Sequence, residues 1–96
     1  MSKINETRLD NFKLIRKDMS FFICIEDDDS TYTDANIDYT EYPDLNPDNA
    51  EVYNINGYIC IKYNITKDGC TIIKVPDITI EDLYLLIGDK SDEVNN

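Results

Sequence analysis

The sequence predicts a single α+β domain over residues 1–96, in which a small antiparallel sheet of three to four strands is followed by a C-terminal helix. Three patterns predict this fold class. Residues 58–75 have the pattern of two strands joined by a turn, residues 21–25 form an unbroken apolar run, and residues 79–88 have helical periodicity. A chain of 96 residues has room for one modest core, because a domain of this size buries only about two thirds of its unfolded surface.

The clearest of these patterns is the hairpin, in which Lys67-Asp68-Gly69 separates two segments of alternating, β-branched residues. A two-residue loop would pair Thr66 with Thr71, whereas a three-residue loop with a left-handed Gly69 would pair Thr66 with Cys70. We favour the second register because it produces the cleaner apolar face. That face consists of Ile59, Ile61, Tyr63, Ile65, Ile73 and Val75.

A short helix is predicted after the hairpin. Pro76 ends the second strand, Thr79 is a suitable N-cap before two acidic residues, and Gly88 is a suitable stop. The helix would bury a stripe that consists of Ile80, Leu83, Leu86 and Ile87. Residues 89–96 are polar, and we expect them to form a flexible tail.

The apolar run Phe21–Ile25 predicts a central strand that is buried on both faces and pairs with the hairpin. Residues 5–17, which precede it, fit two interpretations. Apolar residues recur at helical spacing across this segment and suit an N-terminal helix, whereas Phe12, Leu14 and a turn-like sequence at 17–20 suit a strand. Of the two, we favour the helix.

The middle of the chain is expected to be irregular. Residues 26–56 are mostly polar and contain Pro43 and Pro47, which predicts a region that is largely loop, with an edge strand over 36–42. We see no internal repeat and no domain boundary.

The composition argues against enzymatic and metal chemistry. The three cysteines, Cys24, Cys60 and Cys70, lie in or beside apolar segments, and the chain has no histidine to complete a zinc site, so we expect buried, reduced thiols. Three glycines form no phosphate-cradling loop. We therefore predict no catalytic activity, no cofactor and no metal. The first residues lack a signal-peptide core and no segment approaches the ~18 apolar residues of a membrane span, which predicts a cytoplasmic protein.

The charge is the most distinctive property of the sequence. The net charge is -11, and no lysine or arginine occurs between Lys17 and Lys62. That stretch carries eleven acidic residues, so its negative charge has no neighbouring cation in sequence. Tyrosines are interleaved with the acids, and tyrosine offers the apolar area and hydroxyl group that binding surfaces use. The sequence therefore predicts an acidic recognition surface for a basic partner.

The candidate partner-binding residues are the acids and tyrosines of this stretch. They are Glu26, Asp27, Asp28, Asp29, Tyr32, Asp34, Asp38, Tyr39, Glu41, Tyr42, Asp44 and Asp48. Carboxylates that alternate on a strand fall ~6.6 Å apart, a spacing near that of successive phosphates, and Asp34 and Asp38 are candidates for such a row. We expect such a surface to imitate nucleic acid and to occupy the basic groove of a nucleic-acid-binding protein.

Size and charge favour an inhibitor of this kind, by analogy with small acidic phage proteins such as anti-CRISPRs and restriction inhibitors. An immunity protein or antitoxin that neutralises a basic nuclease would use the same electrostatics. A structural or regulatory module, in which the acids only confer solubility, is the third hypothesis. Direct nucleic-acid binding and membrane association are not expected at this charge, and an exposed hairpin edge would allow a homodimer.

Overall fold

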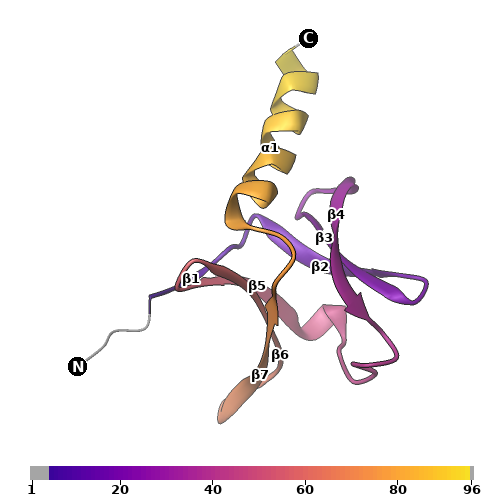
Figure 1. The fold of residues 1–96 in the computed structure, drawn as a ribbon, viewed down its shortest axis with the longest axis vertical. Coiled ribbons are helices and arrows are strands. Elements are labelled where there is room, and N and C mark those ends of the chain that lie inside the picture. The colour runs from indigo at the N-terminus through magenta and orange to yellow at the C-terminus, as the bar shows by residue number, and fades with distance from the viewer. Residues whose placement is uncertain (1–4, 96) are drawn as a thin grey trace.

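The structure, a computed structural model, describes the backbone of residues 5–95 and the side chains of residues 5–88. It contains seven strands, a 3₁₀ turn and one α-helix in the described part of the chain (Figure 1). The elements in chain order are β1 (Glu6–Arg8), β2 (Phe12–Lys17), β3 (Ser20–Ile25), β4 (Asp28–Asp38), η1 (Pro47–Asn49), β5 (Ala50–Ile55), β6 (Tyr58–Thr66), β7 (Gly69–Val75) and α1 (Ile80–Asn95). The predicted α+β class is confirmed.

The strands form two antiparallel sheets where a single sheet was expected. One has the order β1-β5-β6-β7 and the other the order β2-β3-β4. The chain passes from the first sheet to the second at residues 9–11, where the Leu9 amide still donates a hydrogen bond to the Val52 carbonyl at 2.8 Å before β2 begins. The inner faces of the sheets share one core, and α1 rises from their junction (Figure 1).

The prediction of an N-terminal helix over residues 5–17 is wrong. This segment contains β1 and β2, and a two-residue turn after Lys17 returns the chain into β3. Phe12 and Leu14 point into the core at 4 % and 3 % exposure, while the side chains between them face outward. The strand interpretation therefore holds, because the burial has a period of two and Asp18 takes the left-handed φ of 58° that a tight hairpin turn requires.

Strand β3 is the central strand that the apolar run predicted, but its partners differ from those expected. It lies between β2 and β4 and does not pair with the hairpin. Phe21 and Ile23 are fully buried in the core cluster, which also contains residues of the hairpin. β3 and the hairpin therefore share a hydrophobic core but are not hydrogen-bonded to each other. The sequence does not distinguish these arrangements, because a five-residue apolar run can be buried in either.

The hairpin β6–β7 is confirmed, but its register differs from both registers considered above, which paired Thr66 with Thr71 or with Cys70. Thr66 pairs with Gly69, so Lys67 and Asp68 form the loop, and an irregularity then shifts the pairing so that Tyr63 lies opposite Thr71. Asn64 adopts a φ of 51° at this irregularity, a conformation that asparagine tolerates better than most residues. The extra residue is therefore absorbed in β6 and not in the loop. The predicted inner face is buried at Ile59, Ile61, Tyr63, Ile73 and Val75, and Ile65 is half-buried.

Helix α1 begins as predicted and ends later. The Thr79 amide donates to the Asp82 carboxylate at 2.9 Å, and the Asp82 amide donates to the Thr79 hydroxyl at 3.2 Å, which forms a reciprocal cap. Leu83 is fully buried, and Ile80, Leu86 and Ile87 pack against the core. Gly88 does not stop the helix, which continues to Asn95. The expected flexible tail, 89–96, lies outside the residues whose side chains are described.

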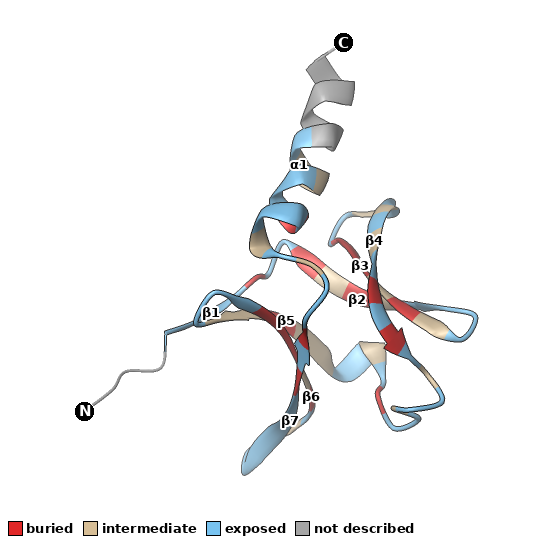
Figure 2. Cartoon of the chain, in the orientation of Figure 1, coloured by how far each residue is buried: buried red, intermediate tan, exposed pale blue. Residues whose placement is uncertain are grey.

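The core runs between the two sheets and under the first turn of α1, where the buried residues concentrate (Figure 2). Cys24 and Cys60 are buried, as expected, and burial raises the pKa of both thiols. Cys70 is exposed, contrary to expectation, because it lies on the outer part of β7 beyond the core.

Candidate functional site

The acidic middle of the chain is more ordered than its composition suggested. Residues 28–38 form β4, the longest strand, where a largely irregular region was expected, and the edge strand anticipated at 36–42 lies earlier. Residues 50–55 form β5, an inner strand of the other sheet. Polar residues are compatible with β4 because it is an edge strand, and only Ala35 and Ile37 are buried in it.

The register of β4 sets the position of its carboxylates. Asp34 lies opposite Phe22 and Asp38 opposite Ser20, although Asp34 and Asp38 are four residues apart. The extra residues, Ala35 and Asn36, form a bulge in which Asn36 has a left-handed φ of 58°. Since Ser20 and Phe22 are alternate residues of β3, the two aspartates occupy adjacent positions on one face, ~6.6 Å apart along the strand. The two carboxylates are therefore neighbours, as the row of carboxylates predicted from the sequence requires. In a regular strand Asn36 would lie between them, and it is the bulge that makes them adjacent.

Tyr32 occupies the next position on this face, opposite Cys24. Its ring meets the Phe22 ring edge-on with 5.2 Å between centroids, and the Lys17 ammonium lies 4.0 Å from its centroid. Tyr32 is 39 % exposed. The outer face of β3 and β4 therefore presents an aromatic group and two carboxylates in succession.

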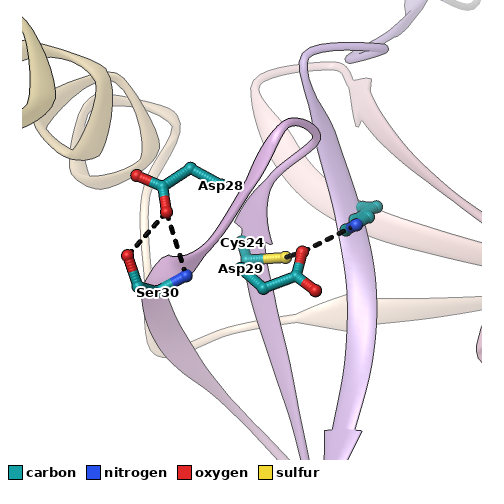
Figure 3. Close-up of polar contacts among 5 residues, drawn as sticks. Cys24, Asp28, Asp29 and Ser30 are labelled. Carbon is teal, nitrogen blue, oxygen red and sulfur yellow. Dashed lines mark hydrogen bonds and ion pairs between the residues drawn. The ribbon is translucent and has the colours of Figure 1, made fainter.

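Three of the predicted aspartates accept hydrogen bonds from residues two or three positions later. Asp28 accepts from the Ser30 amide and hydroxyl at 3.1 and 2.6 Å (Figure 3). Asp34 accepts from the Asn36 amide at 2.8 Å. Asp38 accepts from the amide and hydroxyl of Thr40, both at 2.8 Å, and these bonds lower the pKa of Asp38 below its ordinary value. Such Asx turns hold the carboxylates in fixed orientations without neutralising them.

Asp29 has a different environment. Its carboxylate lies 2.7 Å from the Lys13 ammonium and 4.0 Å from the Cys24 sulfur, and Figure 3 shows it directed across the sheet from the start of β4. The hydrogen bond to Asp29 raises the pKa of Lys13. Asp29 is therefore compensated by a cation, unlike Asp34 and Asp38.

Several basic residues lie over tyrosine rings. The Arg16 guanidinium is 3.5 Å from the Tyr39 centroid, and the Lys74 ammonium is 3.7 Å from that of Tyr58. Within residues 5–88, ion pairs with carboxylates are formed by Arg8, Lys13 and Lys62. Arg16 and Lys74 therefore contact tyrosine rings through cation–π interactions and form no ion pair with a carboxylate within residues 5–88. Tyr39, predicted as a binding residue, is half-buried against Phe21 and serves this structural role.

The remaining predicted residues lie elsewhere. Glu26 and Asp27 form the exposed turn between β3 and β4, and Glu41 is exposed after β4. Tyr42 is half-buried against the core. Asp44 accepts a hydrogen bond from the Asn64 amide group of β6 at 3.0 Å, and Asp48 belongs to η1. The structure therefore places Glu26 to Asp38 along β4 and the turn before it, and Asp44 and Asp48 on the segment that follows β4.

An open groove of about 820 Å³ runs beside β2, between the two sheets. Its charged residues are balanced, with four cations and four acids. They are Arg8, Lys13, Arg16, Lys17, Glu26, Asp29, Asp48 and Glu51. Sequence reasoning missed this groove because it favoured a helix over 5–17, although the alternation of Phe12 and Leu14 was the signal for a strand that places Lys13 and Lys17 on one outer face.

Within the described residues, no group of three or more histidine, cysteine, aspartate or glutamate side chains is arranged to hold a metal ion. Nor does that part of the chain contain a helix of the length and apolarity that a bilayer crossing requires. The chain matches no protein-family model, and comparisons with curated proteins and with solved structures find no similar protein.

Proposed function

We propose that this protein is a cytoplasmic inhibitor of the phage anti-defence kind, which occupies the basic nucleic-acid-binding groove of a partner protein. The surface that would make contact is the outer face of β4, which we call the β4 acidic face and define as Tyr32, Asp34, Asp38 and the adjoining Glu41. Its negative charges would replace phosphates, and release of counterions from the partner's groove would favour association.

The observation that carries this proposal is the placement of Asp34 and Asp38 at adjacent positions on one face. Within residues 5–88 neither carboxylate belongs to an ion pair, and of the cations on β2, Lys17 lies over Tyr32 and Arg16 over Tyr39. Their Asx turns fix both carboxylates before binding, so less side-chain entropy is lost when a partner docks.

A charge-removal experiment tests this proposal. Asp34→Asn, Asp38→Asn and Glu41→Gln are combined in one variant, in which asparagine still supplies the oxygen that each Asx turn requires. The control combines Asp68→Asn, Asp77→Asn and Glu81→Gln, three exposed acids that do not belong to β4, and removes the same charge from a total of -11. Each protein is immobilised and used to capture proteins from a bacterial lysate at low salt.

The expected result is that the unmodified protein and the control capture the same nucleic-acid-binding protein, that duplex DNA displaces it, and that high salt releases it. The β4 variant should capture it much less. Equal loss in the two variants would show that only net charge matters, and capture that DNA cannot displace would refute the occupation of a nucleic-acid groove.

A further inference from the structure

The four sheet edges differ in how they are protected against pairing with another strand. Edge β1 has three residues, two of them charged, and edge β2 carries Lys13, Arg16 and Lys17. Edge β4 has four aspartates and two register irregularities. Charges, bulges and short length are the devices by which exposed edges avoid association. Each of these three edges has at least one of them.

Edge β7 lacks this protection over most of its length. Its seven residues, Gly-Cys-Thr-Ile-Ile-Lys-Val, include one charge and no proline, and residues 69–72 are exposed. Ile72 is 51 % exposed, although isoleucine has a strong strand propensity and much apolar area. The sequence of β7 thus resembles that of a strand with neighbours on both sides, whereas only β6 pairs with it in this chain.

The outer face of the sheet that contains β7 is less acidic than the chain as a whole. On the outer face of its sheet, Arg8 pairs with Glu51, Lys62 pairs with Glu6, and the Lys74 ammonium lies over Tyr58. These described residues give three cations against two acids in a protein of net charge -11. A second copy of the chain would therefore meet less negative charge on this face than the net charge of -11 implies.

We propose that β7 pairs antiparallel with β7 of a second copy, which joins two four-stranded sheets into one continuous sheet across a two-fold axis. The contact is isologous, so the same strand supplies both sides. The backbone groups of the free edge would gain partners, and the Ile72 side chains would be covered. This proposal does not depend on the β4 acidic face, which lies in the other sheet.

The proposed dimer has an unusual salt dependence. Two copies of charge -11 repel one another at long range, and salt screens that repulsion. Dimerisation should therefore strengthen between about 0.1 M and about 1 M salt, as the Debye length falls from roughly 10 Å to roughly 3 Å. Capture of a basic partner should weaken over the same interval, so the two interactions are distinguishable.

Sedimentation equilibrium of the full chain at both salt concentrations provides the test, with Ile72→Lys as the disruptive variant. Leu85→Lys is the matched control, because it also replaces an exposed aliphatic residue with lysine, at 63 % exposure on α1. Ile72→Lys should weaken the dimer on the order of tenfold or more, since each copy would then bring a charged side chain to the paired edge in place of an apolar one. Leu85→Lys should dimerise like the unmodified chain.

Cross-linking at Cys70 gives an independent readout, because the other two thiols are buried. In an antiparallel pairing centred on Thr71, Cys70 of one copy lies opposite Ile72 of the other on the same face, and the two Cys70 side chains are diagonal neighbours within the reach of a short thiol-specific cross-linker. A covalent dimer that Cys70→Ser abolishes would support the proposal. A monomer at every concentration and salt level, or a dimer that Ile72→Lys and Leu85→Lys affect equally, would overturn it.

Discussion

Replacing Leu83 with alanine should reveal how strongly α1 is anchored to the two sheets. Leu83 is fully buried and belongs to the core cluster, whose other members come from both sheets. The change removes three buried carbon atoms, at about 0.8 kcal/mol each, and leaves a cavity, so we expect a loss of about 3 to 4 kcal/mol in the free energy of unfolding. That is a large part of the roughly 5 to 15 kcal/mol typical of a domain.

Leu85→Ala is the matched control, because the same change two residues later removes a side chain that is 63 % exposed. It should alter the free energy of unfolding by no more than about 0.5 kcal/mol. Urea denaturation followed by circular dichroism measures both variants, and a thermal scan should show Leu83→Ala melting on the order of 15 °C or more below the parent. Equal stabilities for the two variants would refute the docking of α1 through Leu83.

Three further predictions concern β4 and the thiols. Asn36→Gly should leave the free energy of unfolding nearly unchanged and Asn36→Val should lower it by about 1 to 2 kcal/mol, because a β-branched residue resists the left-handed φ; equal denaturation midpoints would contradict the bulge. The pKa of Asp38 is lowered in the folded state, so its turn stabilises the fold above the unfolded pKa and this contribution disappears as the pH falls through the folded pKa. Acid denaturation should therefore be less steep below about pH 4 for Asp38→Ala than for the parent; identical profiles would exclude the contribution. A water-soluble thiol reagent should label Cys70 rapidly in the native protein and leave Cys24 and Cys60 unmodified, which mass spectrometry of the digested protein can establish.

Local signals account for the parts of the fold that the sequence predicted. The hairpin was evident from alternation on both sides of Lys67-Asp68-Gly69, and the start of α1 from Thr79 followed by acids. Both signals act within a few residues, so no knowledge of tertiary structure was needed. The end of α1 was mispredicted because an exposed glycine costs a helix only about 1 kcal/mol, which the rest of the helix can offset.

The second sheet could not be predicted in the same way. In the segment 5–17, the apolar residues fit a period of two as well as a helical period, and only pairing with β5 and β3 and burial in the shared core decide between them. Strand β4 has the composition of a loop, because one of its edges and its outer face lie in solvent. Its acids were identified individually from the sequence. Their proximity depends on register and on the bulge, which composition does not encode.

The bulge at Ala35 and Asn36 also determines which length changes the strand can tolerate. It contains an even number of extra residues, so Ile37 returns to the core and Asp38 to the outer face in the same phase as the residues before it. Deletion of both residues would preserve the two faces, with Ile37 between Asp34 and Asp38 in a regular alternation. Deletion of one would require a new one-residue bulge, or Ile37 and Asp38 would exchange faces and bring a carboxylate into the core. Related sequences that vary in length here should therefore differ by two residues more readily than by one.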